Sequence, residues 1–137
     1  MPNLAELFTA AVGARERAYA PYSHFTVGAA LETTDGRRFT GSNVENASYG
    51  LTVCAERTAI VAAVHAGARG IAAIAVTGPD GVTTAPCGAC RQVIAEFAAP
   101  DVPVRYAEGS GVRDTTVGAL LPGAFTAHAL DAARGDG

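Results

Sequence analysis

The sequence predicts an α/β domain of three layers (α/β/α), in which helices cover both faces of a mixed central sheet of about five strands. Three observations lead to this prediction. Segments with helical spacing alternate along the chain with segments of strand character, and an early hairpin signal makes part of the sheet antiparallel. The chain of 137 residues is long enough to bury one core. We therefore expect residues 1–137 to form a single domain.

Several segments have the spacing or the composition of helices. In the first of them, the apolar residues Leu4, Leu7, Phe8, Ala11 and Val12 fall on one helical face. The expected helices cover residues 4–18, 54–65 and 88–97, with a shorter one over residues 117–121. The end of the chain, residues 127–137, is rich in Ala, Gly and Asp, so we expect a weak helix or a frayed, flexible tail.

Strand character begins at Phe25, where apolar residues start to alternate with small or polar ones. Asp35-Gly36 is a tight-turn signal, so the strand over residues 25–31 and a return strand over residues 38–44 form a hairpin. Further strands are expected over residues 71–77 and 102–107, whereas residues 108–116 are interpreted as a loop.

Composition and charge exclude several classes of protein. With 49% hydrophobic and 17% charged residues, the chain is not of the intrinsically disordered type. A net charge of −3 argues against a dedicated nucleic-acid-binding module, which carries a basic excess. No secretory signal and no apolar run of about 20 residues is visible, so we expect a cytoplasmic protein that does not span a membrane. In that compartment its three cysteines stay reduced.

These cysteines are the first candidate site. Cys87 and Cys90 form a Cys-x-x-Cys motif at the start of an expected helix, and Cys54 begins another. The spacing suits two thiolates on one metal ion, but it also suits a redox dithiol, and Cys54 alone could be a small buried apolar residue. His65 lies about 16 Å further along its helix than Cys54 and cannot share a metal with it. Three ligands with an open position therefore fit better than a closed structural site.

Glu56 stands two residues after Cys54, in the first turn of the same expected helix. A metal-bound water needs a nearby carboxylate to take its proton and return it to a substrate. The alternative is a glutamate that is favoured there by the helix dipole alone. Residue chemistry by itself does not separate these two interpretations.

Two arginines could offset the charge of such a site. Three thiolates and Zn²⁺ sum to −1, and this excess charge opposes acidification of a bound water. Arg57 follows Cys54 by three residues and Arg91 follows Cys87 by four, spacings that bring side chains together on helices. We predict that Arg57 and Arg91 donate hydrogen bonds to cysteine sulfurs; the alternative is two arginines that face solvent.

Together these residues identify a resemblance. Cys54-Ala55-Glu56, followed by Pro86 and the Cys-x-x-Cys motif, resembles the zinc-dependent cytidine deaminase superfamily, in which a glutamate that is not a ligand carries the protons. The closer similarity is to the small, homotetrameric nucleoside deaminases. It extends over about residues 20–125, through the stretches PYS (21–23), FTVGAAL (25–31), NVENASYGLTVCAERTA (43–59), PCGACRQV (86–93) and LLPGAF (120–125).

The resemblance implies a function: hydrolytic deamination of cytidine and deoxycytidine to uridine and deoxyuridine, with release of ammonia, in pyrimidine salvage. It implies one Zn²⁺ per subunit, held by Cys54, Cys87 and Cys90, and Glu56 as the catalytic proton carrier. It also implies a cytidine-deaminase-like fold and a homotetramer whose active sites are shared between subunits.

The resemblance also implies a set of substrate contacts. Asn43 and Glu45 resemble a ribose-binding pair, although a polar strand end could explain them. Phe25 resembles an aromatic residue that packs on the pyrimidine, with a plain core residue as the alternative. The backbone N–H of Ala55 would meet the base carbonyl. Tyr49 and Phe125 resemble residues that reach a neighbouring subunit's site, although a Phe near the C-terminus is more often a core anchor.

Two rival functions remain open at this point. One is a deaminase of the same scaffold acting on a polynucleotide or on an antibiotic nucleoside; a polynucleotide would require a positive groove. The other is a zinc-stabilised interaction module without catalysis, which would leave Glu56, Asn43 and Glu45 without a role.

Overall fold

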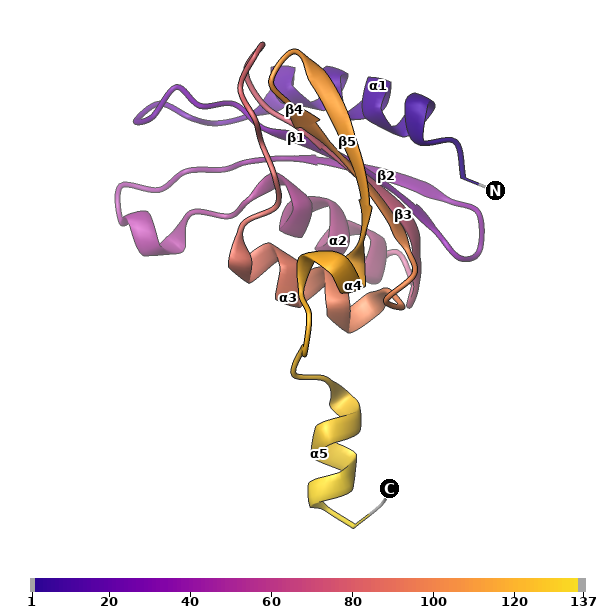
Figure 1. Cartoon of the computed structure of the whole chain (residues 1–137). Helices are drawn as coiled ribbons and strands as arrows, with labels where there is room; N and C mark the ends of the chain where they lie inside the picture. The colour runs from indigo at the N-terminus through magenta and orange to yellow at the C-terminus, as the bar shows by residue number, and fades with distance from the viewer. Residues whose placement is uncertain (1, 136–137) are drawn as a thin grey trace.

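A five-stranded mixed sheet forms the centre of the computed structural model, which describes residues 2–135 (Figure 1). The strand order is β2-β1-β3-β4-β5. The strands are β1 (Gly28–Thr33), β2 (Arg38–Ser42), β3 (Ile71–Thr77), β4 (Pro103–Glu108) and β5 (Gly111–Thr116). The β3–β4 pair is parallel and the other pairs are antiparallel, which confirms the predicted mixed sheet.

Helices lie on both faces of this sheet, as predicted (Figure 1). They are α1 (Leu4–Ala14), α2 (Ala55–His65), α3 (Gly88–Phe97), α4 (Val117–Leu120) and α5 (Ala127–Ala133). The first is shorter than expected, because the chain tightens into a 3₁₀ turn at Arg15–Arg17 before it leaves the helix. In the described residues, no helix is both long and apolar enough to cross a membrane.

The two faces of the sheet have separate cores. On one face, Leu7 and Ala11 of α1 pack against the small residues Ala30, Ala73 and Ala75 of β1 and β3. On the other face, α2 and α3 cover the larger residues of the same strands; this core includes Ala29, Leu31, Ile74, Val76, Ile60 and Ile94. Neighbouring residues of β1 thus point to opposite cores, as the period of two requires.

Two glycines let helices approach the sheet closely. A Cβ added at Gly28 would lie 2.0 Å from the Ala11 carbonyl oxygen of α1. One added at Gly41 would lie 2.5 Å from the Ala59 nitrogen and 2.6 Å from the Ala55 oxygen of α2. The missing side chains therefore set the distance between β2 and the helix that begins at Cys54.

The strand boundaries differ from the prediction at the start of β1. The strand begins at Gly28 instead of Phe25, because the Asn43 side chain occupies the backbone groups of the preceding residues. Its Oδ1 accepts from Val27 N (2.8 Å) and its Nδ2 donates to Phe25 O (2.8 Å). At the other end of the hairpin, β2 stops at Ser42, and Val44 instead pairs with Val53 in an isolated bridge.

The interpretation of residues 108–116 as a loop is wrong. Residues Gly111–Thr116 form β5, the edge strand that pairs with β4 after a turn at Gly109. Most of this strand is exposed, so its residues lack the apolar alternation of a half-buried strand. The pairing is supported across the ladder by an ion pair between Arg105 and Asp114 (2.7 Å).

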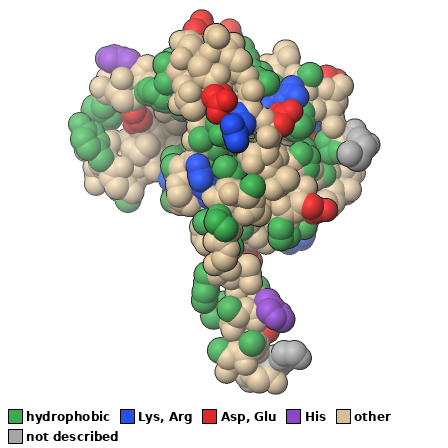
Figure 2. Space-filling view, viewed as in Figure 1, with side chains coloured by type: hydrophobic (Ala, Val, Ile, Leu, Met, Phe, Trp, Pro, Cys, Tyr) green, Lys and Arg blue, Asp and Glu red, His purple; other side chains and the backbone are tan. Residues whose placement is uncertain are grey.

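The C-terminal helix α5 extends away from the body of the molecule (Figure 1). The predicted weak helix is thus present over Ala127–Ala133, and residues 136–137 of the predicted tail lie outside the described residues. The space-filling view shows hydrophobic side chains along this arm, and acidic and basic side chains interspersed on the face shown (Figure 2).

Candidate active site

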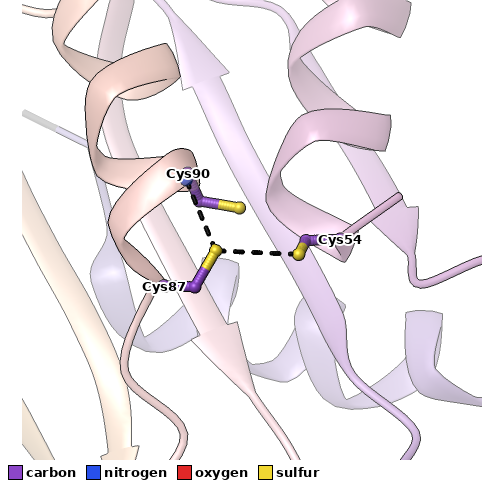
Figure 3. A group of neighbouring side chains, drawn as sticks. All are labelled: Cys54, Cys87 and Cys90. Carbon is purple, nitrogen blue, oxygen red and sulfur yellow. Dashed lines mark hydrogen bonds between the residues drawn. The ribbon is translucent and has the colours of Figure 1, made fainter. Parts of the chain in front are cut away.

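Three cysteine sulfurs meet where α2 and α3 begin (Figure 3). Cys54 is the residue before the first turn of α2, and Cys87 holds the same position at α3. Cys90 follows in the first turn of α3 and is fully buried. The three sulfurs lie within 4.8 Å of one another, with Cys54 Sγ and Cys87 Sγ 3.7 Å apart.

This geometry fits a tetrahedral zinc ion. Zinc–sulfur bonds of about 2.3 Å place two thiolates of one tetrahedron about 3.8 Å apart. The Cys54–Cys87 separation is already close to that value. No histidine, aspartate or glutamate of the described residues joins the cluster, so three sulfurs leave a fourth coordination position free of protein.

The surroundings of Cys54 favour a thiolate. A hydrogen bond with Cys90, together with one from Arg57, lowers the pKa of Cys54 to about 5 against the opposing effect of burial. The contact with Cys54 and burial raise the pKa of the Cys90 thiol. The thiolate form is therefore favoured at Cys54, which lies at the start of α2, where the helix dipole also stabilises it.

Glu56 lies at the second position of α2 and is only 3% exposed. Burial is the main cause that raises the pKa of its carboxyl group above the ordinary value. A carboxyl group with a raised pKa exchanges protons more readily near neutral pH, which suits a general acid and base. Its neighbour Cys54 and the cavity described below place it beside the sulfur cluster.

The predicted contact of Arg57 with sulfur is present. Its Nη2 lies 3.4 Å from Cys54 Sγ and 3.4 Å from the Thr52 carbonyl oxygen. Among the described residues, its Nε is buried and has no hydrogen-bond partner. The guanidinium group thus contacts the Cys54 sulfur through Nη2, while its Nε–H donor has no partner among the described residues.

The corresponding prediction for Arg91 is wrong. Its Nε donates to the Pro86 carbonyl oxygen (2.8 Å) and its Nη1 to the Leu120 carbonyl oxygen (3.0 Å), and neither bond goes to a sulfur. The spacing of four residues does place Arg91 one turn beyond Cys87. However, the end of α4 lies beside α3 and offers a carbonyl group that the guanidinium reaches instead.

A cavity of about 190 Å³ opens beside the sulfurs. Its wall brings together six of the predicted site residues: Phe25, Asn43, Cys54, Ala55, Glu56 and Cys87. At about 30 Å³ for each water, this volume equals about six waters and can accommodate one heterocyclic ring. Ala55, whose N–H is at the start of α2, is fully buried in this wall.

A second cavity of about 370 Å³ is lined by Tyr22, Ser23, Glu45, Tyr49 and Thr52. Thr52 lines both cavities, so they adjoin at this residue. The second cavity contains the remaining predicted sugar contact, Glu45. Together the two cavities provide a small compartment near the sulfurs and a larger, more polar one beside it.

Glu45 and Asn43 both hold the loop before β1. Glu45 Oε1 accepts from Tyr22 N (3.0 Å) and Ser23 N (3.2 Å), and its other oxygen accepts from the Ser23 hydroxyl. The hydrogen bond from that hydroxyl is the main cause that lowers the pKa of Glu45, so this carboxylate is ionised at neutral pH. Asn43 holds the next part of the loop, which includes Phe25.

The other two predicted contact residues, Tyr49 and Phe125, are largely exposed. Tyr49 stands at the rim of the larger cavity with 75% of its surface exposed, and its ring meets that of Tyr22 edge-on at 6.2 Å. Phe125 lies on the segment after α4, 63% exposed, and lines neither cavity.

Several residues of the cavities were not predicted from the sequence. They are Tyr22, Ser23, Val27, Thr52, Thr84 and Ala85. Tyr22 and Ser23 belong to the PYS stretch and Thr52 to the NVENASYGLTVCAERTA stretch. Their place in stretches that carry the resemblance could have identified them as site residues. Thr84 and Ala85 have no such signal, because Thr84 reaches the site through its bridge to Ala107 of β4.

The chain matches a known protein family. Residues 1–106 match the cytidine and deoxycytidylate deaminase zinc-binding region. A cytidine deaminase of Halalkalibacterium halodurans is 51% identical over 126 residues, which cover 91% of this chain and 96% of that protein. One of Sporosarcina psychrophila is 51% identical over 118 residues, covering 85% and 87%.

Solved structures agree with these sequences. A crystal structure of cytidine deaminase from Burkholderia pseudomallei superimposes with a TM-score of 0.83 at 55% identity, covering 90% of this chain and 100% of that one. The cytidine deaminase from Mycobacterium tuberculosis gives a TM-score of 0.80 at 40% identity, covering 91% and 98%.

Proposed function

Because this chain belongs to the cytidine and deoxycytidylate deaminase family, we propose that Cys54, Cys87 and Cys90 hold its Zn²⁺, one per subunit, and that Glu56 carries the protons of its reaction. The reaction is the hydrolytic deamination of cytidine to uridine and ammonia. The main support for the assignment of residues is one observation: Cys54, Cys87 and Glu56 face the same ring-sized cavity.

The base is proposed to enter the smaller cavity. Phe25 provides an aromatic wall there, and the N–H at Ala55 provides a donor for the carbonyl group of cytosine. This orientation directs N3 and C4 of the ring to Glu56 and the sulfur cluster. The fully buried backbone at Ala55 limits competition from water for that donor.

Glu56 then moves two protons. Zn²⁺ held by Cys54, Cys87 and Cys90 would supply an acidified water as the nucleophile for C4 of the base. The Glu56 carboxylate takes the proton of this water and passes it to N3, which leaves C4 tetrahedral. It next takes the proton of the new C4 hydroxyl group and transfers it to the amino group, so the C4–N bond breaks, ammonia leaves and C4 becomes the carbonyl carbon of uridine. Water and cytidine are thereby converted to uridine and ammonia, and Glu56 returns to its starting state.

The sugar is proposed to occupy the larger cavity beyond Thr52, which Glu45 lines, with Asn43 in the wall of the adjoining smaller cavity. Both side chains are fixed by the loop over residues 20–27, and Glu45 is charged, so each offers a hydrogen-bonding group in a defined position. We include deoxycytidine as a substrate, and place the enzyme in pyrimidine salvage in the cytoplasm.

A homotetramer with shared active sites is part of the proposal. Large apolar side chains remain exposed at the rim of the cavities and on the C-terminal segment: Tyr49, Leu51 and Phe125 are each more than 60% exposed. Such residues are expected where another surface covers them. Tyr49 and Phe125 would then complete the site of a neighbouring subunit.

An ammonia-release assay with four substrates tests this function. We expect release from cytidine and deoxycytidine, and none from cytosine base or from a single-stranded oligonucleotide. Release from the oligonucleotide would instead support a polynucleotide-editing enzyme. If zinc is bound but none of the four compounds is deaminated, the protein is a zinc-stabilised interaction module.

The ligand assignment has a separate test. Cys87→Ser replaces a soft thiolate by a hydroxyl, which binds Zn²⁺ weakly. Elemental analysis should then find clearly less than one zinc per chain, whereas Ser48→Ala, outside the cluster, should leave the zinc content at one. Full zinc content in Cys87→Ser would exclude Cys87 as a ligand.

A further inference from the structure

Two adjacent residues of α3 donate to the segment that follows the sheet. Arg91 Nη1 donates to the Leu120 carbonyl oxygen (3.0 Å), and Gln92 Nε2 donates to the Phe125 carbonyl oxygen (2.8 Å). The same Arg91 donates through Nε to the Pro86 carbonyl oxygen (2.8 Å), directly before Cys87. One helix turn therefore contacts both the start of the cysteine motif and the segment that bears Phe125.

The segment from Leu120 to Phe125 has few other attachments. Helix α4 is only four residues long, so its last carbonyl groups have no partner within the helix. The Phe125 side chain is 63% exposed and packs in neither core. Beyond it, α5 extends away from the body (Figure 1). Besides the bond from Leu121 N to the Val117 carbonyl oxygen (3.1 Å), the hydrogen bonds from α3 are the polar contacts given for this segment in the described residues.

We propose that Arg91 and Gln92 are positioning residues: their hydrogen bonds hold the segment that bears Phe125 in place. They belong to the helix at whose start Cys87 and Cys90 lie. This inference rests on the proposed function, in which Phe125 completes the site of a neighbouring subunit. It gives α3 two tasks: its first turn holds zinc, and its second turn fixes the aromatic residue that is delivered to the next active site.

Gln92 is the better residue for a test, because it is exposed and its loss should not disturb the core. Gln92→Met has a similar length and helix propensity but no N–H donor. Gln92→Lys restores a donor of similar reach. Glu96→Met, exposed one turn further along α3, is the matched control, since its side chain has no hydrogen bond to the Phe125 segment.

Two measurements are made on each variant: hydrogen exchange of a peptide that covers residues 121–126, and steady-state kinetics with cytidine. One lost hydrogen bond corresponds to about a fivefold change in an opening equilibrium. In Gln92→Met we expect exchange and KM each to rise about fivefold, while kcat and zinc content stay within about twofold of the wild type. Gln92→Lys should return both values toward the wild type, and Glu96→Met should match it.

The proposal is overturned if Gln92→Met leaves exchange or KM unchanged, or if Glu96→Met raises both to the same extent. A loss of zinc with a fall in kcat would also overturn it, because Gln92 would then support the helix as a whole. Failure of the proposed function is distinguishable: the wild type itself would then lack zinc or activity on cytidine, and the exchange comparison would still decide whether Gln92 holds the Phe125 segment.

The variant Arg91→Lys provides a second, independent test of the proposal. A single ammonium group keeps the charge but does not reproduce the fork that serves two carbonyl groups. We expect faster exchange in the peptide over residues 117–122 and faster transfer of zinc to a colorimetric chelator. An unchanged exchange rate and an unchanged transfer rate would remove Arg91 from the positioning role.

Discussion

Glu56 shows how burial serves chemistry at a single residue. A carboxyl group that is 3% exposed costs stability when ionised, and the same burial raises its pKa toward the range of a proton carrier. The side chain lies beside the cysteines but is not part of the sulfur cluster, so in the proposed reaction it would move protons without binding the metal.

Replacement of Glu56 by alanine should therefore abolish turnover while the protein stays intact. We expect kcat to fall by at least about 10²–10⁴-fold, the usual contribution of a positioned acid–base group, with one zinc per chain and an unchanged circular dichroism spectrum. Near-normal turnover would show that another group carries the protons.

Arg57 controls the charge on the cluster. Its hydrogen bond is one cause of the lowered pKa of Cys54, so Arg57→Gln should raise the pKa of that sulfur and make it a more strongly donating ligand. A more strongly donating thiolate opposes acidification of the water on zinc. We therefore expect the acidic limb of the kcat–pH profile to move to higher pH. A profile that coincides with that of the wild type would count against this role.

At this scale, what the sequence reveals depends on how local the interaction is. Cys54, Cys87 and Cys90 could be grouped from their spacing at the starts of two helices, and their sulfurs do lie within 4.8 Å of one another, whereas the role of Glu56 was expected only from the resemblance. Arg91 was misassigned because its partner, the Leu120 carbonyl group, comes from a helix 29 residues later in the chain. No local pattern reports such a partner.

Among the elements, the contact between β2 and α2 has little room for change. A Cβ at Gly41 would lie within 2.6 Å of two backbone atoms of the helix that carries Glu56, and backbone cannot move aside as a flexible side chain can. Gly13, in contrast, lies within α1 with open space around its Cα. A side chain at Gly41 would therefore clash with the backbone of α2, whereas a side chain at Gly13 would meet nothing.

Alanine at these two positions should change stability in opposite directions. Gly41→Ala should lower the free energy of unfolding by about 1–3 kcal/mol through overpacking. Gly13→Ala should raise it by about 0.5–1 kcal/mol, because alanine loses less backbone entropy in a helix. Urea denaturation measures both. A neutral Gly41→Ala would mean that α2 can shift away from the sheet without cost.

The predictability of an element follows its burial. Helices α2 and α3 and strand β3 each bury apolar residues in a regular pattern, and their expected ranges agree with the structure to within one residue at each end. Strand β5 lies at an exposed edge and has no such pattern, and the start of β1 is displaced by a side chain from residue 43, which no local rule describes.

At the scale of the whole molecule, the number of chains that associate is the property that the sequence pattern indicates least. Neither periodicity nor composition reports how many chains associate, and the tetramer was expected from resemblance alone. The structure adds exposed apolar residues at the cavity rim and on the C-terminal segment, which are what an interface would cover.

Light scattering in solution tests the assembly. We expect a particle of four times the 13.8 kDa mass of one chain. Phe125→Ala should raise KM for cytidine if this residue completes a neighbour's site, and Leu130→Ala, further along the exposed arm, is its control. A monomer with full activity would contradict shared active sites.

The projecting arm also bears on how long a chain survives in a cell. Residues 121–126 are exposed or half-buried and join the body of the molecule to α5, none of whose residues belongs to either core, so this joint is where a protease would cut. In an isolated chain this stretch is open to cleavage, whereas docking against partners would shield it. Degradation would then remove orphan copies first, and the surviving pool would be enriched in assembled enzyme.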